Sequence, residues 1–136
     1  MSALTQEQER AAFAPESSIA VVAGAGTGKT HVLIERYVHL VLDRNVEVGR
    51  ILALTFTERA AREMRDRVRK ALEERGRSDL ARASEFAPIS TIHAFLSRIL
   101  RERALDASID PRFVIADEMT AQLHLEAALA KTVDGL

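Results

Sequence analysis

The sequence predicts an α/β fold in which helices flank a parallel sheet. Three short apolar runs, at 19–22, 51–54 and 89–91, are each followed by a longer segment with helical periodicity. Continuous apolar runs are typical of strands buried on both faces of a parallel sheet. Successive strand–helix units join such strands through right-handed crossovers. A glycine-rich stretch between the first run and its helix is the third observation, and it shows where a ligand would bind.

Residues 23–30 read Ala-Gly-Ala-Gly-Thr-Gly-Lys-Thr and contain three of the six glycines. Glycines let backbone N–H groups surround an anion, and the following helix adds its free N–H groups and its dipole. The ending Gly28-Lys29-Thr30 has the form of a P-loop, whose lysine reaches the outer phosphates and whose threonine hydroxyl binds Mg²⁺. The usual first glycine is Ala23 in this chain. We therefore predict a P-loop NTPase fold with Lys29 and Thr30 as catalytic residues and Thr30 as the metal ligand.

Periodicity and capping residues predict five helices, at 5–13, 29–44, 57–76, 92–103 and 119–133. Thr5 is the expected N-cap of the first helix, with Gln8 completing a capping box. Thr57 is the expected N-cap of the third, whose apolar stripe recurs every four residues from Ala60 to Leu72. Residues 77–87 show no clear signal, and we expect a connector.

The carboxyl ends of the three predicted strands should line one edge of the sheet, where ligands bind in open α/β folds. That edge would bring together the loop at 23–30, the residues 55–57 and the residues 90–93. The arginine-rich helix at 57–76 begins from the same edge. A nucleotide and a polyanion are the ligands that this arrangement favours. The arginines could equally form a solvated helix face, and any DNA contact from them would be to phosphates.

Composition describes a globular protein, with 47% hydrophobic and 29% charged residues. The net charge of −1 conceals a pattern, because residues 50–103 carry 13 basic and 8 acidic groups. No apolar run approaches 20 residues, so no membrane span is expected. Cysteine is absent, which excludes a disulfide framework and a cysteine-based metal site. The sequence predicts a cytoplasmic location.

Four motifs stand in order along residues 4–103: Leu-Thr-x-x-Gln at 4–8, Ala-Gly-Ala-Gly-Thr-Gly-Lys-Thr-His-Val-Leu at 23–33, Leu-Thr-Phe-Thr-Glu-Arg-Ala-Ala-Arg-Glu-Met at 54–64, and Ser-Thr-Ile-His-Ala-Phe at 90–95. Together they resemble the N-terminus of UvrD/Rep/RecB-type superfamily 1 DNA helicases. The last two motifs resemble the recombination helicase–nuclease branch, AddA and RecB, more than UvrD and Rep, which often have Asn-Lys where Glu58-Arg59 stand. The resemblance implies part of a RecA-like motor domain over 1–105 and the start of an inserted helical subdomain over 106–136.

The resemblance also implies ATP and Mg²⁺ as cofactors and DNA as the partner. Gln8 matches the residue that reads the adenine edge. The nucleotide-binding residues implied are Gln8, Gly24, Ala25, Gly26, Thr27, Gly28, Lys29, Thr30 and His31. His31 stands where UvrD and Rep commonly have an arginine. The residues implied to contact single-stranded DNA are Phe56, Thr57, Thr91 and His93. Taken alone, Phe56 could be a core residue at a strand end, and His93 could be a local hydrogen-bond partner.

Hydrolysis in this family also needs an acidic Walker B site, a water-positioning glutamine and arginine fingers. Asp117 and Glu118 follow an apolar run, but an acidic pair at a helix N-terminus is explained by the helix dipole. We therefore expect the chain to be the first part of a longer ATP-dependent DNA helicase of repair or recombination. That helicase would act on single strands or at a duplex junction, together with a helicase–nuclease partner protein. The fragment alone is not expected to unwind DNA.

Two other classes of function stay open from the residues alone. One is a non-catalytic module that binds nucleotide or single-stranded DNA. The other is a different P-loop enzyme, such as a small kinase using Asp117 or Glu118 near its metal. Nuclease activity of the longer protein cannot be read from these residues.

Overall fold

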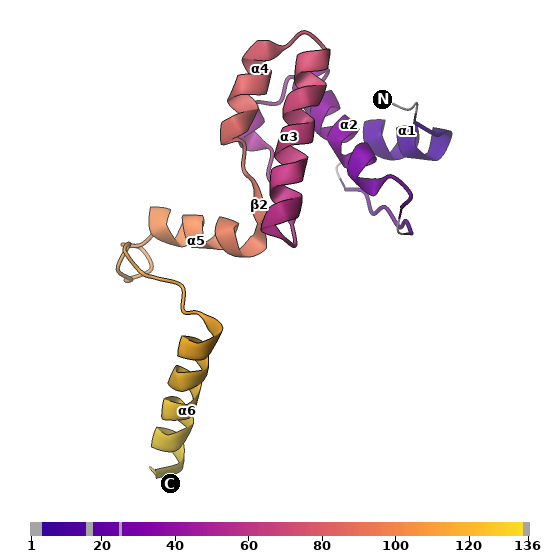
Figure 1. Ribbon diagram of the computed structural model, residues 1–136. Coiled ribbons are helices and arrows are strands. Elements are labelled where there is room, and N and C mark those ends of the chain that lie inside the picture. Colours follow the sequence, from indigo (N-terminus) through magenta and orange to yellow (C-terminus); the bar gives the residue numbers. More distant parts are fainter. Residues whose placement is uncertain (1–3, 16–17, 25, 135–136) are drawn as a thin grey trace. The chain divides into compact units, whose positions relative to one another are not determined.

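Helices dominate the described part of the chain, which comprises residues 4–15, 18–24 and 26–134 of a computed structural model (Figure 1). The elements in chain order are α1 (Gln6–Phe13), α2 (Lys29–Leu42), the 3-10 helix η1 (Val48–Arg50), β1 (Ala53–Thr55), α3 (Glu58–Glu74), α4 (Ser78–Ala83), the 3-10 helix η2 (Ser84–Phe86), β2 (Ile89–Thr91), α5 (Ile92–Glu102) and α6 (Glu118–Asp134). The chain divides into two compact units, one up to Leu96 and one from Ser97 onward.

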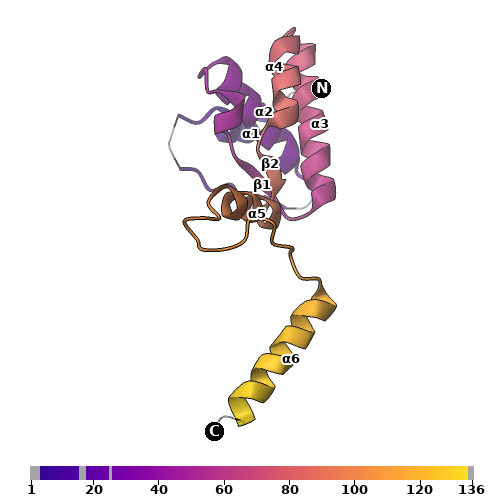
Figure 2. The same cartoon turned by 90° about the vertical axis from the view of Figure 1, so that its left-hand side faces the viewer.

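The sheet of the first unit consists of β1 and β2, which pair in parallel. The register places Ala53 opposite Ile89, Leu54 opposite Ser90 and Thr55 opposite Thr91. Helix α3 makes the crossover between the strands, and Figure 2 shows α3 and α4 side by side next to them. This arrangement confirms the predicted class, an α/β fold with a parallel sheet flanked by helices.

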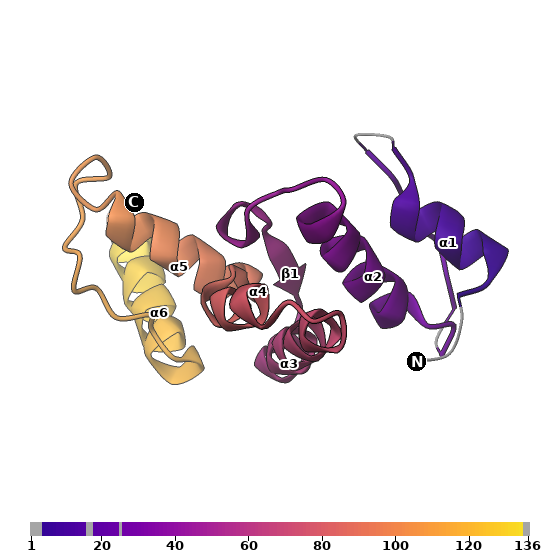
Figure 3. The same cartoon turned by 90° about the horizontal axis from the view of Figure 1, so that it is seen from above.

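The core of the first unit lies where α2, α3 and α4 meet one side of the sheet. Figure 3 shows α2 between α1 and the β1–α3 region. Side chains from all of these elements are buried together: Ile34, Tyr37, Val38, Val41, Val48, Ala53, Met64, Val68, Ala71, Leu72, Ala81, Ala87 and Ile89. The predicted apolar stripe of α3 is confirmed at Met64, Val68 and Leu72. This packing fixes the two helices that begin at the predicted ligand sites.

Side-chain caps fix where two of the helices begin. Thr5 Oγ1 accepts a hydrogen bond from the Gln8 N–H, and Gln8 Oε1 accepts one from the Thr5 N–H at 2.9 Å, so the predicted capping box is confirmed. Thr57 Oγ1 accepts from the Ala60 N–H at 3.1 Å and caps α3 as predicted. Helix α3 ends before Gly76, whose φ of 73° suits glycine.

The apolar run at 19–22 is not a strand in this structure, contrary to the prediction. Residues 18–22 have no regular secondary structure, and Val21 and Val22 are 51% and 99% exposed. A strand needs a hydrogen-bonded neighbour, and among the described residues the sheet consists of β1 and β2 alone. Apolar content therefore predicted an element that has no pairing partner here.

Residues 77–87 form more structure than their sequence indicated. They contain α4 and η2, and Ala81 and Ser84 are almost fully buried against the rest of the unit. Both elements are shorter than two helical turns, which is too short for apolar periodicity to show. The strand β1 also lies two residues later than predicted, at Ala53–Thr55.

In the second unit, α6 begins where an acidic residue caps it. Asp117 Oδ1 accepts a hydrogen bond from the Thr120 N–H at 2.8 Å, and the hydrogen bonds to Thr120 lower the pKa of the Asp117 carboxyl. The apolar residues 113–116 before it form no strand. The acidic pair therefore lies at a helix N-terminus, as the dipole interpretation predicted, and not at the end of a Walker B strand.

Tyr37 provides a test of this packing, because it is the single tyrosine of a chain without tryptophan. Its side chain is 3% exposed, and burial raises its pKa to about 12. The folded state thus holds the phenolic proton more tightly than the unfolded state, whose pKa is about 10. The stabilisation is present below pH of about 10 and is lost as pH rises toward about 12.

We expect ultraviolet titration of the native chain to show no tyrosinate until the pH approaches about 12 or the chain unfolds. The variant Tyr37→Phe should lack this absorbance change. Ionisation with a midpoint near 10 while circular dichroism stays native would contradict the buried position of Tyr37.

Candidate nucleotide and DNA sites

The glycine loop takes backbone conformations that other residues rarely adopt. Gly26 and Gly28 have φ angles of 76° and 82°, and Gly28 is the N-cap residue of α2. A β-carbon at Gly28 would lie 3.0 Å from Gln8 Nε2. Glycine at this position therefore serves both the turn and the close approach of α1. Ala25, which was predicted as a nucleotide-binding residue, lies outside the described residues.

The Lys29 ammonium bonds to carbonyl oxygens of the loop itself. Its Nζ donates to Ala23 O at 2.7 Å and to Gly24 O at 2.5 Å, and Thr27 Oγ1 donates to Gly24 O at 2.8 Å. The loop is therefore closed around the lysine that the motif assigns to the phosphates. Thr30, in the first turn of α2, is exposed.

Gln8 connects α1 to this loop. While its Oε1 takes part in the capping box, its Nε2 donates to Thr27 O at 3.0 Å. Gln8 and Lys29 line one cavity of about 390 Å³, whose other lining residues are Thr5, Glu7, Ala11, Val21, Val22, Ala23, Thr27 and Val32. The structure thus brings the predicted base-reading and phosphate-binding residues to the same space, with apolar side chains forming part of its wall.

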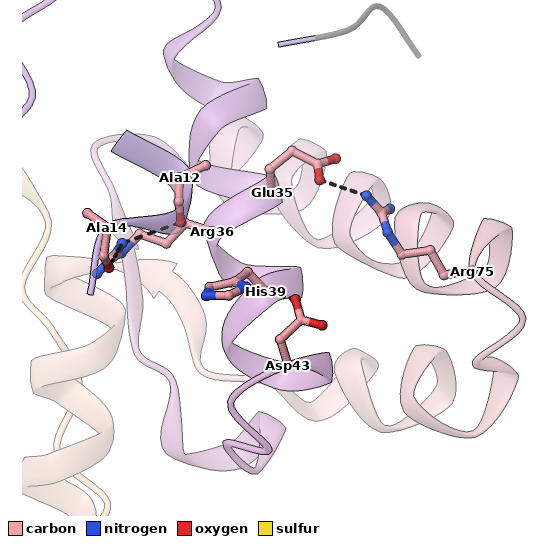
Figure 4. Close-up of polar contacts among 7 residues, drawn as sticks. All are labelled: Ala12, Ala14, Glu35, Arg36, His39, Asp43 and Arg75. Carbon is pink, nitrogen blue, oxygen red and sulfur yellow. Dashed lines mark hydrogen bonds and ion pairs between the residues drawn. The ribbon is translucent and has the colours of Figure 1, made fainter. Parts of the chain in front are cut away.

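The C-terminal end of α1 is held on α2 by Arg36 (Figure 4). The Arg36 Nη1 donates to the carbonyl oxygens of Ala11, Ala12 and Ala14, at 3.4, 3.4 and 3.3 Å. These carbonyls are among those that a helix end leaves without intrahelical partners. The Phe13 ring also meets the His39 ring edge to face, at 5.2 Å between centroids. Helix α1 is therefore fixed at both ends against the P-loop and its helix.

His31 lies in a different space from Gln8. It lines a cavity of about 250 Å³ with residues of α2 and α3: Ile34, Arg67, Lys70, Ala71 and Glu74. The structure therefore does not bring His31 into the cavity shared by Gln8 and Lys29. Its role in nucleotide binding stays a prediction.

The predicted DNA-binding residues gather at the carboxyl edge of the sheet, because Thr55 pairs with Thr91 and the chain leaves both strands at the same level. Phe56 is 96% exposed, so it is not a core residue. His93 is exposed as well. Thr91, by contrast, is buried, with its hydroxyl donating to Glu58 Oε1 at 2.7 Å and accepting from the Ala94 N–H at 3.2 Å. Thr57 caps α3.

Sequence reasoning missed three of the residues that organise these sites. Arg36 anchors α1, Glu58 holds Thr91, and Glu35 forms an ion pair with Arg75 across α2 and α3, at 2.6 Å. Each acts through a contact between elements that are distant in sequence. Only the polar character of Glu35 and Arg36 on an otherwise apolar helix gave a signal.

Within the described ranges, no group of three or more histidine, aspartate or glutamate side chains is placed to hold a metal ion. The search of the same residues found no helix long and apolar enough to cross a membrane.

Comparison with known protein families agrees with the fold and with the loop. The chain belongs to the UvrD/REP helicase N-terminal domain family, whose family model matches residues 4–135. Within this family, the chain falls in the AddA branch predicted from the motifs at 54–64 and 90–95.

That assignment rests on relatives that are named as the AddA component of an ATP-dependent helicase/nuclease. The protein from Syntrophomonas wolfei is 42% identical over 99% of this chain, which corresponds to 12% of the relative. The proteins from Acetivibrio thermocellus and Clostridium botulinum are 40% and 35% identical over 90% and 97% of the chain, and 11% of each relative is covered. The chain thus spans about one ninth to one eighth of the length of these relatives.

Proposed function

We propose that this chain is the nucleotide-binding and DNA-contacting part of an ATP-dependent DNA helicase of repair or recombination. The observation that carries the proposal is the one cavity lined by both Gln8 and Lys29. The relatives' name, which describes one component of a helicase/nuclease, supports DNA as the substrate and a second component as the partner. In this proposal residues 1–105 belong to a RecA-like motor domain, and residues 106–136 begin an inserted helical subdomain.

The residues of the loop fit a nucleoside triphosphate with Mg²⁺. The N-terminus of α2 and the glycine backbone offer N–H groups to phosphate oxygens. Lys29 would exchange the carbonyls of Ala23 and Gly24 for the outer phosphates, which are stronger acceptors because they are charged. Thr30 would hold Mg²⁺, which supplies charge neutralisation when bound. No acidic cluster of the described residues completes a metal site, so we propose binding by this chain without turnover.

The Gln8 amide is placed to recognise adenine. Its Oε1 accepts from the Thr5 N–H and its Nε2 donates to Thr27 O, and these two bonds fix which end of the amide carries the donor. One lone pair and one N–H are left over. Adenine presents a donor and an acceptor side by side, which a glutamine pairs with twice, whereas guanine presents two acceptors there. We propose that Gln8 favours ATP over GTP.

The test is competition of ATP and GTP against a fluorescent ATP analogue on the whole chain. We expect ATP to compete better than GTP. Gln8→Glu keeps a carboxylate oxygen for the Thr5 N–H but removes the donor, so it should abolish the preference, about tenfold for one lost hydrogen bond, with little change in melting temperature. Equal competition by ATP and GTP on the native chain would refute base reading, and no competition at all would refute nucleotide binding.

A single strand of DNA would lie along the carboxyl edge of the sheet. The exposed ring of Phe56 would stack on a base, which contributes binding without sequence preference, as a motor requires. Thr57 and His93 would contact the same strand. Thr91, being buried, would act by holding Glu58 and the first turn of α5 in place.

A further inference from the structure

The middle of α3 carries an arginine-lined pocket that neither the nucleotide cavity nor the sheet edge uses. The pocket has a volume of about 310 Å³ and lies between α3 and η2. Its lining residues are Arg62, Arg65, Asp66, Arg69, Ser84 and Glu85. The spacing of three and then four residues places the three arginines on one face of the helix.

Two of these arginines have no counter-charge among the described residues. Arg69 Nη1 is paired with Glu73 Oε1 at 2.8 Å, whereas no ion pair joins Arg62 or Arg65 to a carboxylate in that part of the chain. The Nε of Arg65 is buried without a hydrogen-bond partner, which leaves a strong donor unsatisfied. With Asp66 and Glu85 counted, the lining carries a net charge of +1. That charge matches a single phosphodiester group.

An exposed aromatic residue adjoins the pocket in sequence. Phe86 ends η2 directly after Glu85 and is 87% exposed. Among the described phenylalanines, only Phe56 is more exposed. A basic groove for the backbone beside a free aromatic ring for the base is the combination that binds single-stranded nucleic acid.

We propose that Arg62, Arg65 and Phe86 form a second contact for single-stranded DNA. The two guanidinium groups bind one backbone phosphate in the pocket, and the neighbouring base stacks on Phe86. This inference rests on the proposed DNA-binding function, because α3 begins directly after Phe56 and Thr57. Arg62 lies five residues after Thr57, about 7.5 Å along the helix axis, so one strand can reach both contacts.

The charge part of the proposal is tested by the salt dependence of binding. Fluorescence anisotropy with an oligothymidine of about 20 nucleotides measures the affinity of the whole chain between about 50 and 200 mM salt. Arg62→Gln/Arg65→Gln should weaken binding and reduce the slope of log K against log salt by about 0.7, the value for one phosphate on a single strand. The matched control is Arg67→Gln/Lys70→Gln, which removes the same charge from α3 but lines the cavity beside α2.

The stacking part is tested by Phe86→Ala, which should weaken binding about tenfold and leave the salt slope unchanged. Circular dichroism should show native melting for every variant, because Arg62 and Phe86 are exposed. Phe56→Ala, measured alongside, reports on the sheet edge.

Equal losses in the two charge variants would show an effect of net charge alone and overturn the proposal. Full affinity in the Arg62/Arg65 and Phe86 variants, with loss in Phe56→Ala, would overturn the second contact and leave the proposed function standing. Loss in the former with none in Phe56→Ala would support the second contact and remove the sheet edge from the DNA path. A native chain that does not bind the oligonucleotide would overturn both.

Discussion

Replacement of Lys29 by alanine is expected to weaken ATP binding by at least about tenfold, because a hydrogen bond to a charged group contributes about 1.5–3 kcal/mol. The ammonium group lies on the carbonyls of Ala23 and Gly24, at the mouth of the cavity that Gln8 also lines. Lys29 is exposed, so its removal should leave the melting temperature almost unchanged. Competition against a fluorescent ATP analogue measures the effect.

Lys131→Ala is the matched control, since it removes the same charge from an exposed position on α6, in the other unit. ATP affinity should not change in that variant. Equal losses in both variants would mean that the lysine contributes only through the net charge.

The same pair of variants tests whether the chain can hydrolyse ATP. We expect no DNA-stimulated turnover by the native chain, because Thr30 is the one metal ligand that the loop provides and the described residues add no acidic cluster. DNA-stimulated turnover that Lys29→Ala abolishes would show that the chain contains a complete hydrolytic site, and the proposal of binding without turnover would then be wrong.

The sequence predicted the elements of this fold wherever a local rule decides them. Thr5 and Thr57 cap their helices because a hydroxyl three residues before a free N–H can reach it. The stripe through Met64, Val68 and Leu72 is buried because its spacing matches one helix face. The run at 19–22 failed because pairing depends on a neighbour, and a neighbour cannot be read from an apolar run.

The candidate site shows the same limit. Motifs located Gln8, Gly28 and Lys29, and the structure brings these residues together at one loop. Burial could not be inferred in the same way. Phe56 proved exposed and Thr91 buried, although both follow or end a short strand. Arg36 was missed because its targets are carbonyl oxygens, which leave no trace in a sequence.

Arg75→Met is expected to lower the free energy of unfolding by about 2–4 kcal/mol, because it leaves a buried carboxylate without its partner. The Arg75 Nη2 lies 2.6 Å from Glu35 Oε2 (Figure 4). The Glu35 side chain is only 10% exposed, and its other oxygen already lacks a hydrogen-bond partner. The pair joins α2, which starts at the P-loop, to the residue that ends α3.

Glu35→Met should cost less than Arg75→Met, because the Arg75 side chain is 32% exposed and can turn its charge toward water. The double variant should recover part of the loss, since an apolar pair carries no unpaired charge. Urea unfolding of the native chain, both single variants and the double variant measures this asymmetry. Arg77→Met is the control, because its partner Asp79 is exposed and no measurable loss is expected. Equal costs for the two single variants, with an additive double variant, would mean that the pair does not couple α2 to α3.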